Sequence, residues 1–307
     1  MVDKPSGVTS HDVVATVRRT LGQPKVGHLG TLDPLATGVL PLVIGRATRL
    51  APWFSDATKQ YAAVIRLGLT TDTCDITGTV VPHRSAREHD ETIVLATSHA
   101  IRDAASTFVG TYEQLPPQVS AKKIGGVRAY DLARRKQTVT LKPVKVTVED
   151  LSILAVEGPR IHCRVTSSSG FYVRALARDL GEAVGCGGCL EMLRREQHGP
   201  FALAQAMPLD ELLAETRERA VARIIPIDRL LPEMPVLVAT DRGAERIAHG
   251  NPLRAPEFIL TREHRSTDAG STSWRVLDRE GHLLAIAEHR HDVVQPKVVL
   301  VPRTPVA

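Results

Sequence analysis

The hydrophobic pattern of the N-terminal part of the chain predicts helices and strands in close succession. Four apolar residues recur with the spacing of one face of an α-helix: Val13, Val14, Val17 and Leu21. We expect Ser10 to cap this helix and Gly22 to end it. The apolar run 39–44 lies between two glycines, as is typical of a buried strand, and residues 46–54 indicate a helix. Residues 59–68 have the composition of a second strand.

The same alternation continues through the middle of the chain. Residues 83–91 are polar and irregular and predict a surface loop, whereas residues 91–108 have helical spacing. Residues 161–166 predict a strand, after which Ser167 to Ser169 can cap a helix whose first turn carries Tyr172 and Arg174. The Gly125-Gly126 pair is typical of a hairpin turn.

Proline punctuation and a change in composition predict a linker near residue 232. An acidic-to-basic helix is expected over 209–220, and Pro226 and Pro232 follow it. Beyond them the pattern predicts a β-rich module with one helix, Asp241 to Ala248, and three strands at 274–277, 283–287 and 298–301. At 307 residues the chain exceeds the usual size of one domain, so we expect domains at 1–232 and 233–307.

Composition and charge limit the classes of protein to consider. With 43% hydrophobic residues the chain can bury a core, and 39 basic against 34 acidic residues give a net charge of +5 that mildly favours an anionic partner. No apolar run reaches the roughly 18 residues of a membrane span, and the N-terminus lacks a signal-peptide pattern. We therefore expect a soluble protein in the cytoplasm.

Residues 27–38, Gly-His-Leu-Gly-Thr-Leu-Asp-Pro-Leu-Ala-Thr-Gly, contain the strongest candidate for chemistry, Asp33. Three glycines permit close approach of the backbone to a ligand, and Pro34 restricts the backbone of Asp33. The ordinary alternative is that Asp33 caps a short helix that begins with Pro34.

The string resembles the signature G-H-x-G-T-L-D-P-x-A-T-G-x-L of the TruB family of tRNA pseudouridine synthases. Further segments resemble the family at residues 3–10, 59–61, 114–130, 167–176 and 193–195. Residues 132–136 depart from it. The resemblance implies an enzyme without cofactor that isomerises a uridine in the T loop of tRNA, at position 55, after flipping the base out of its stack. It also implies that Asp33 is the nucleophile.

The resemblance assigns roles to other residues. Tyr61 would stack on the target base beside the aspartate, and Arg174 would pair with the carboxylate. The substrate would contact His28, Tyr172, Leu193, Lys4 and Arg195, with Leu193 covering the base and Lys4 binding phosphate. Ordinary alternatives are a packed strand tyrosine at 61, an exposed helix arginine at 174, a core leucine at 193 and a solvated turn lysine at 4.

The family also implies a fold. Its core is α/β (α+β), with a mixed, largely antiparallel sheet flanked by helices, and residues 233–307 resemble the small β-rich PUA domain, which binds RNA. The alternative for this module is a β-barrel that only stabilises the protein. Family members have a short strand before the motif at residues 3–10, and we expect that strand to be missing here.

Metal binding is not expected. Cys186 and Cys189 form a C-x-x-C pair, but no second pair completes a zinc site, and Asp72 and Asp75 lack the glycine and distal glutamate of a calcium loop. We expect the Asp, Thr and Gly residues of 71–79 to form hydrogen-bonded turns. We also expect no cofactor, no partner other than tRNA, and a monomer. A non-catalytic RNA binder is the competing function, and it predicts loss of the nucleophile or its arginine, both of which are present.

Overall fold

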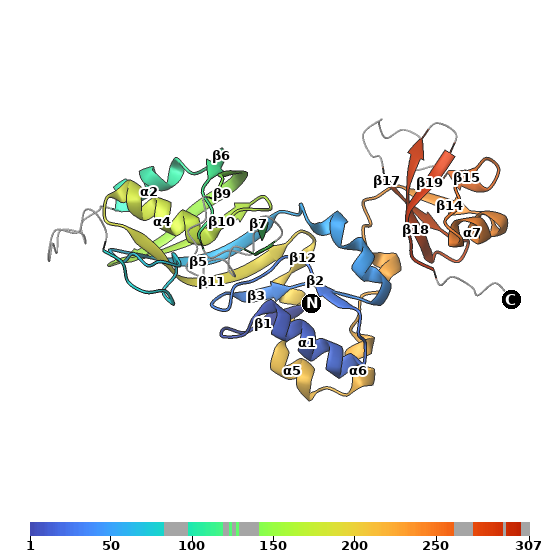
Figure 1. Cartoon of the computed structure of the whole chain (residues 1–307), viewed down its shortest axis with the longest axis horizontal. Coiled ribbons are helices and arrows are strands. Elements are labelled where there is room, and N and C mark those ends of the chain that lie inside the picture. The colour runs from blue at the N-terminus through green and yellow to red at the C-terminus, as the bar shows by residue number, and fades with distance from the viewer. Residues whose placement is uncertain are drawn as a thin grey trace. The chain divides into compact units, whose positions relative to one another are not determined.

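The computed structural model describes residues 1–82, 98–118, 123–124, 127–128, 141–260, 273–290 and 293–301 (Figure 1). The chain forms two compact units. The first comprises residues 1–43 and 51–215, and the second comprises residues 44–50 and 216–307. The boundary after residue 232 that the composition indicates stays a prediction.

A nine-stranded sheet forms the centre of the first unit, in the order β13-β1-β3-β11-β5-β10-β9-β6, with β12 paired to β11. Its strands are β1 (Val2–Lys4), β3 (Thr37–Leu40), β5 (Lys59–Leu67), β6 (Gly110–Gln114), β9 (Val144–Glu157), β10 (Arg160–Ser167), β11 (Gly188–His198), β12 (Phe201–Ala202) and β13 (Met207–Pro208). The pairings β1–β13 and β3–β11 are parallel and the others antiparallel, which confirms the mixed, largely antiparallel sheet.

Two expectations about the N-terminal strands are wrong. Residues Val2–Lys4 themselves form the first strand, which pairs with β3 on one side and β13 on the other. The single strand expected over 39–44 is instead divided between β3 and β4 (Leu42–Ile44), and β4 pairs with β2 (Val26–His28) in a separate small sheet. Pro41 lies at the division because it has no N–H to donate to a ladder.

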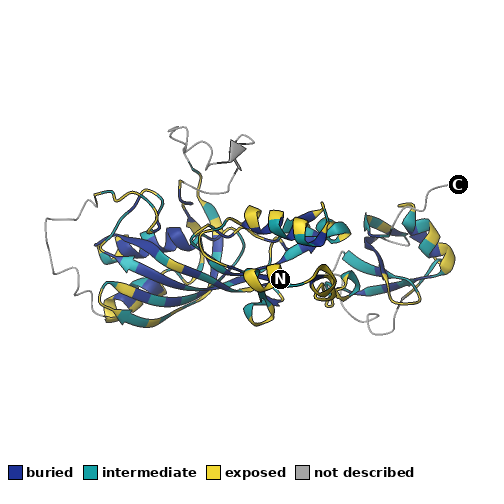
Figure 2. Cartoon of the chain, turned by 90° about the horizontal axis from the view of Figure 1, so that it is seen from below, coloured by how far each residue is buried: buried dark blue, intermediate teal, exposed yellow. Residues whose placement is uncertain are grey.

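Helices cover this sheet. They are α1 (Ser10–Leu21), α2 (Ser98–Ser106), α4 (Val173–Val184) and α5 (Leu209–Ala214), with the 3-10 helix η3 (Leu203–Gln205). The apolar face of α1 is buried as predicted, and Leu176 and Leu180 of α4 are fully buried. Figure 2 shows buried positions along the long strands and on one side of the helices. The core thus lies between the sheet and these helices.

Several predicted helix boundaries need correction. Thr9, not Ser10, caps α1, through a reciprocal capping box with Asp12. Tyr172 precedes α4 and no side chain caps it, so the serines do not have the expected role. The helix expected over 209–220 is two short helices, because Thr216 caps a new one, α6 (Arg217–Ala222). Residues 46–54 lie in a 3-10 helix, η1 (Gly45–Phe54), that contains Pro52.

Other expectations fall partly outside the described residues. These include the loop 83–91 and the first part of the helix expected over 91–108. The predicted hairpin is present as β7 (Lys123–Ile124) paired with β8 (Val127–Arg128), although its two glycines are not among the described residues.

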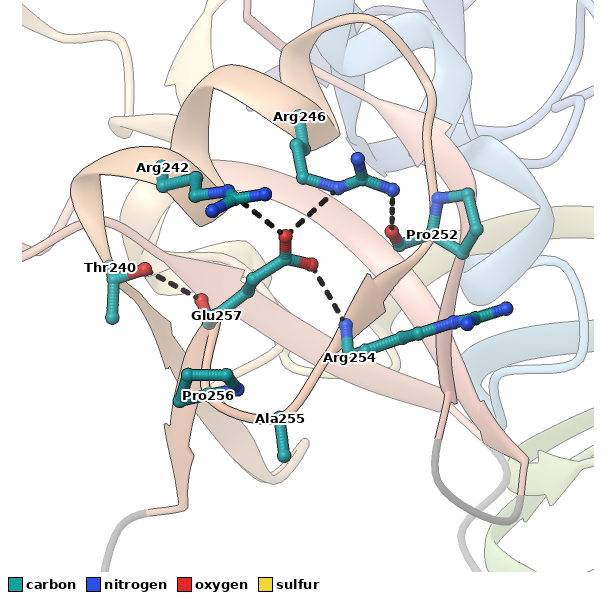
Figure 3. Close-up of a pocket in the computed structure, with 8 residues that line it drawn as sticks. All are labelled: Thr240, Arg242, Arg246, Pro252, Arg254, Ala255, Pro256 and Glu257. Carbon is teal, nitrogen blue, oxygen red and sulfur yellow. Dashed lines mark hydrogen bonds and ion pairs between the residues drawn. The ribbon is translucent and has the colours of Figure 1, made fainter.

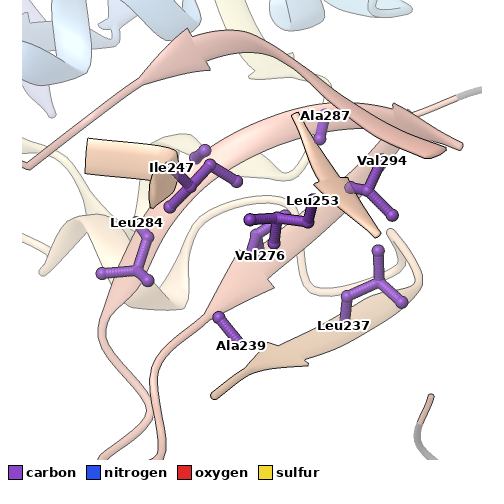
Figure 4. Packing of buried hydrophobic residues seen from close by; sticks show 9 residues of the cluster. Leu237, Ala239, Ile247, Leu253, Val276, Leu284, Ala287 and Val294 are labelled. Atoms are coloured by element: carbon purple, nitrogen blue, oxygen red, sulfur yellow. The ribbon is translucent and has the colours of Figure 1, made fainter. Parts of the chain in front are cut away.

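The second unit has a six-stranded sheet in the order β15-β19-β18-β17-β14-β16. Its strands are β14 (Val236–Ala239), β15 (Leu253–Arg254), β16 (Phe258–Leu260), β17 (Ser273–Leu277), β18 (Leu283–Arg290) and β19 (Val293–Val299), and its other elements include η4 (Ile227–Arg229) and α7 (Asp241–Ala248). Figure 4 shows its core, a buried cluster that contains Ile247 of α7 and side chains of the strands such as Leu237, Val276 and Val294. The helix and two strands are as predicted, whereas β19 begins five residues before the expected 298.

Within the described part of the chain, no helix is long and apolar enough to cross a membrane.

Candidate active site

Asp33 lies in the loop between β2 and β3, and hydrogen bonds from α1 and the segment after β1 fix this loop. Ser10 Oγ accepts from Leu32 N at 2.9 Å, and Gly7 N donates to Pro34 O at 2.9 Å. No helix begins at Pro34, so the capping alternative for Asp33 is wrong. The side chain of Asp33 is 41% exposed. The backbone of the loop is therefore held in place, and the carboxylate that it carries is accessible to a substrate.

Arg174 binds this carboxylate. Its Nε lies 2.8 Å from Asp33 Oδ2, and its Nη1 donates to Thr73 O at 3.0 Å. The Arg174 side chain is only 6% exposed, so the alternative of an exposed helix arginine is wrong. A charge-assisted bond from a buried guanidinium stabilises the ionised carboxylate and fixes its orientation.

A second carboxylate, Asp75, also faces Arg174. Its Oδ2 lies 3.8 Å from Arg174 Nε, and its Oδ1 accepts hydrogen bonds from Thr77 N and Thr73 Oγ1, both at 3.0 Å. The hydrogen-bonded turn expected at residues 71–79 is therefore present, but nothing in the sequence pattern indicates that this turn approaches the aspartate loop, the segment between β2 and β3 that carries Asp33. Asp75 is buried, so it helps to hold Arg174 in place from the side away from solvent.

Tyr61 lies on β5 beside this pair of charges. It is buried, and its cross-strand neighbour on β11 is Arg195, which hydrogen-bonds to the Tyr61 hydroxyl. Burial raises the pKa of Tyr61, the charge of Asp33 raises it further, and Arg195 opposes the shift. The phenol is therefore neutral at physiological pH, and its ring lies close to the candidate nucleophile.

Lys4 and Arg195 are both fully buried. The Nζ of Lys4 donates to Pro5 O at 2.9 Å, to Val8 O at 2.7 Å and to Pro34 O at 3.4 Å, and burial lowers the pKa of Lys4 to about 8. A solvated turn lysine is thus the wrong description. Both cations lie beneath the aspartate loop, and their expected contacts with the substrate stay predictions.

The remaining sequence-predicted residues lie on neighbouring elements. His28 ends β2 and packs edge-to-face on His11, with ring centroids 6.2 Å apart. Gln114 fixes the backbone of Tyr172, accepting from its N–H at 2.9 Å and donating to its carbonyl at 3.1 Å. Leu193 is a nearly buried residue of β11. Their contacts with a substrate also stay predictions.

Among the described residues, no cysteine belongs to a group of three or more side chains close enough together to hold a metal ion. All four are free and buried, and burial raises the pKa of Cys186 and raises that of Cys189 to about 11.

The second unit contains a pocket of about 480 Å³ lined by three arginines (Figure 3). Glu257 accepts ion pairs from Arg246 at 3.2 Å and Arg242 at 3.5 Å, and Arg246 also donates to Pro252 O at 3.2 Å. Arg254 lies on the exposed side of β15 and completes the lining. Three guanidinium groups against one carboxylate leave the pocket with net positive charge.

Comparison with known proteins assigns the architecture to a family. Residues 18–173 match the N-terminal domain of the TruB family of pseudouridylate synthases, and residues 174–232 match the tRNA pseudouridylate synthase B C-terminal domain. The chain belongs to the TruB family. It is therefore an enzyme, a pseudouridine synthase. The loop with Asp33 and the strand with Tyr61 lie in the first matched segment, and Arg174 begins the second.

Relatives of this TruB-family chain match it along nearly its full length. A protein named tRNA pseudouridine synthase B from Solibacter usitatus is 43% identical over 94% of each chain, and one from Thermobifida fusca is 42% identical over 97% of each. A solved Cbf5-Nop10-Gar1 complex contains a chain with a TM-score of 0.69 and 25% identity. That match covers 98% of this chain and 84% of the other, which confirms the pseudouridine synthase fold.

Proposed function

We propose that this enzyme isomerises uridine to pseudouridine at position 55 of the tRNA T loop. The names of the relatives support tRNA as the substrate class. A uridine stacked within the loop is inaccessible, so the base must be flipped out before it reaches the carboxylate. The protein acts as a monomer in the cytoplasm and needs no cofactor.

Asp33 is the nucleophile in this proposal. The observation that supports it is the 2.8 Å ion pair with Arg174, which leaves the carboxylate half-exposed, charged and fixed in direction on a rigid loop. Asp33 adds covalently to the sugar or to the base, the N1–C1′ bond of the uridine breaks, and the uracil turns. C5 then bonds to C1′, and the bond to Asp33 breaks so that the carboxylate is regenerated. The proton lost from C5 is balanced by the proton gained at N1, so no redox partner is needed.

The surrounding residues hold the flipped nucleotide. Tyr61 supplies an aromatic face for the uracil, and Leu193 and Tyr172 limit the space around it, while His28 enters the tRNA loop that the base has left. Lys4 and Arg195 organise the loop from beneath, because each donates to its backbone carbonyls.

Residues 233–307 form a PUA-like domain that contacts tRNA outside the T loop. The arginine-lined pocket of Figure 3 supports this assignment, because guanidinium groups bind phosphate oxygens in a fork geometry. Contacts of this kind supply affinity and salt dependence and leave the bond-breaking step unaffected.

One experiment tests the activity and its nucleophile together. An unmodified tRNA transcript is incubated with the wild type and with Asp33→Asn, and pseudouridine is mapped by position. We expect product at position 55 with the wild type and none with the variant, although the variant still binds tRNA because its positioning contacts remain.

The matched control is Asp103→Asn, which removes an exposed carboxylate on α2 of the same unit. This variant should be as active as the wild type. Appreciable product from Asp33→Asn would remove the nucleophile assignment, and product at another position would change the proposed target.

A further inference from the structure

Arg195 is a fully buried guanidinium with no carboxylate partner among the described residues. An isolated buried charge is costly unless hydrogen bonds satisfy it. Here the Nε donates to Val39 O at 2.8 Å, Nη2 donates to Gly30 O at 3.1 Å, and the group also hydrogen-bonds to the Tyr61 hydroxyl. One side chain thus connects the loop that carries Asp33 with the strand that carries Tyr61.

Two glycines lie close to Arg195. A Cβ atom added to Gly38 would lie 2.2 Å from the backbone oxygen of Arg195, and one added to Gly30 would lie 3.3 Å from its Nη1. Strand β11 places Arg195 between Gly38 of β3 and Tyr61 of β5. Gly38 therefore lets β3 lie close to the backbone of Arg195, whose cross-strand neighbour on β5 is Tyr61.

The chemistry of the guanidinium determines which group donates in its hydrogen bond with Tyr61. Arginine only donates, so the phenolic oxygen accepts in this bond. The single hydrogen of the phenol must then point away from Arg195. This bond consequently restricts the position of the phenolic oxygen, and the adjacent positive charge stabilises electron density on it.

We propose that Arg195 is a positioning residue, which fixes the hydroxyl of Tyr61 relative to Asp33 by donating to the phenolic oxygen from beneath the site. This inference rests on the proposed function, in which Tyr61 faces the flipped uracil. It differs from the direct substrate contact that the sequence suggests, because Arg195 acts through another residue and not on RNA.

A double-mutant cycle tests the proposal. Single-turnover rates at saturating tRNA and dissociation constants are measured for Arg195→Met, Arg195→Lys, Tyr61→Phe and the double variants. We expect Arg195→Met to lower the rate by about tenfold or more with little change in affinity, and Arg195→Lys to restore part of it. In the Tyr61→Phe background, Arg195→Met should have little further effect, because the group through which it acts is gone.

If the losses in rate from the two substitutions are additive, Arg195 only supports the fold. If Arg195→Met weakens tRNA affinity but leaves the rate unchanged, Arg195 contacts the substrate. Either result overturns the proposal. Arg164→Met on β10 is the matched control, since that arginine is more exposed and pairs with Glu196 at 2.7 Å. Urea unfolding of each variant identifies any that fold poorly.

A second measurement does not depend on activity. The chain has four tyrosines, so NMR of isotope-labelled tyrosine in the free protein can assign Tyr61 by comparison with Tyr61→Phe. The Tyr61 ring carbon that carries the hydroxyl should shift in Arg195→Met and less in Arg195→Lys. An unchanged resonance would overturn the proposal even if the wild type modifies tRNA, whereas a wild type without tRNA activity would overturn the proposed function alone.

Discussion

At the scale of single residues, two positively charged side chains lie near the carboxylate of the candidate nucleophile, Asp33. Arg174 contacts Asp33 directly, and Lys4 lies close enough for the charge of Asp33 to raise its pKa against the larger effect of burial. Backbone carbonyls accept hydrogen bonds from both side chains, and these bonds hold the two cations in place in the free protein. In the proposed mechanism, a carboxylate that is oriented before binding lowers the cost of reaching the transition state.

Tyr61→Phe separates stacking by the Tyr61 ring from a second role that we propose for its hydroxyl, removal of the proton at C5. The ring keeps its stacking contribution, about 1 to 3 kcal/mol per base, so tRNA affinity should change little. The rate should fall, because the phenolic oxygen is a candidate for proton removal at C5, and such steps commonly contribute about 10² to 10⁴ in rate. The measurements are tritium release from C5-labelled uridine in tRNA and the dissociation constant, with Tyr61→Leu as the variant that also loses the ring.

The raised pKa of Tyr61 makes this test informative. A neutral phenol is a weak base, so a wild-type release rate in Tyr61→Phe would leave Tyr61 as a stacking surface only. Equally poor binding by the Phe and Leu variants would instead show that hydroxyl and ring act as one unit.

His198 predicts how stability depends on pH. Its ring is buried on β11, and burial, followed by the charges of Arg195 and Lys59, lowers its pKa to about 3 from 6.5. Between these values the unfolded chain binds more protons than the folded one, so the free energy of unfolding falls as pH falls from about 6.5 towards 3. The slope from this one group is up to about 1.4 kcal/mol per pH unit.

The measurement is urea unfolding of the wild type and of His198→Gln at several pH values between about 7 and about 4.5. In this range the histidine of the unfolded chain becomes protonated, because its pKa is about 6.5. The amide of glutamine can donate to Phe54 O as the imidazole Nε2 does at 3.3 Å, but it does not titrate. We expect a smaller pH slope in the variant. Parallel curves for the two proteins would mean that His198 is not neutral in the folded state.

The sequence identified the residues of the site better than their surroundings. Asp33 and Arg174 were predicted as a pair and lie in contact. Asp75 was missed because its approach to Arg174 depends on a turn that folds back onto β11, where Ile76 N donates to Leu190 O at 2.8 Å. The burial of Lys4 and Arg195 could likewise not be predicted from the sequence. A motif specifies residue types and their spacing, but it does not show whether a side chain points into the core or towards solvent.

At the scale of elements, the existence of most helices and strands followed from hydrophobic spacing, but their ends did not. The apolar run 39–44 has no internal polar residue, so periodicity alone could not show that Pro41 divides it between two sheets. Caps were misplaced for a similar reason. Thr9 and Ser10 are both good caps, and the choice depends on Ser10 bonding to Leu32 instead.

Gly38→Ala should destabilise the first unit because of the contact between β3 and β11. Gly38 has φ of +103°, and the added Cβ would lie 2.2 Å from the Arg195 carbonyl oxygen. We expect a loss above about 3 kcal/mol, more than backbone strain alone produces. The matched control is Gly158→Ala, at φ +56° with open space around it, which should cost about 1 to 2 kcal/mol. Urea unfolding of both variants gives the comparison, and equal losses would mean that the close contact relaxes freely.

At the scale of the whole molecule, the second unit includes segments that precede the sequence-predicted boundary. Leu283 N donates to Asp228 Oδ1 at 2.6 Å, and Arg46 Nη1 donates to Leu300 O at 3.0 Å. These bonds connect η4 and η1 to the strands of the six-stranded sheet. Deleting residues 233–307 would therefore leave these groups without partners, so point substitutions are a cleaner probe of RNA binding than truncation.

The arginine-lined pocket gives that probe. Arg254→Gln and Arg242→Gln remove exposed guanidinium groups, whereas Arg246 is retained because it holds Pro252 and Glu257. If each removed group binds a phosphate, tRNA affinity should fall and the slope of log affinity against log salt should decrease by about 1 per contact. The rate at saturating tRNA should stay the same, because remote contacts bind substrate and transition state equally. Arg279→Gln, an exposed arginine outside the pocket, is the control and should change neither quantity. If the pocket variants keep both the wild-type affinity and the wild-type salt slope, then the pocket only stabilises this unit, and the PUA-like assignment loses its structural support.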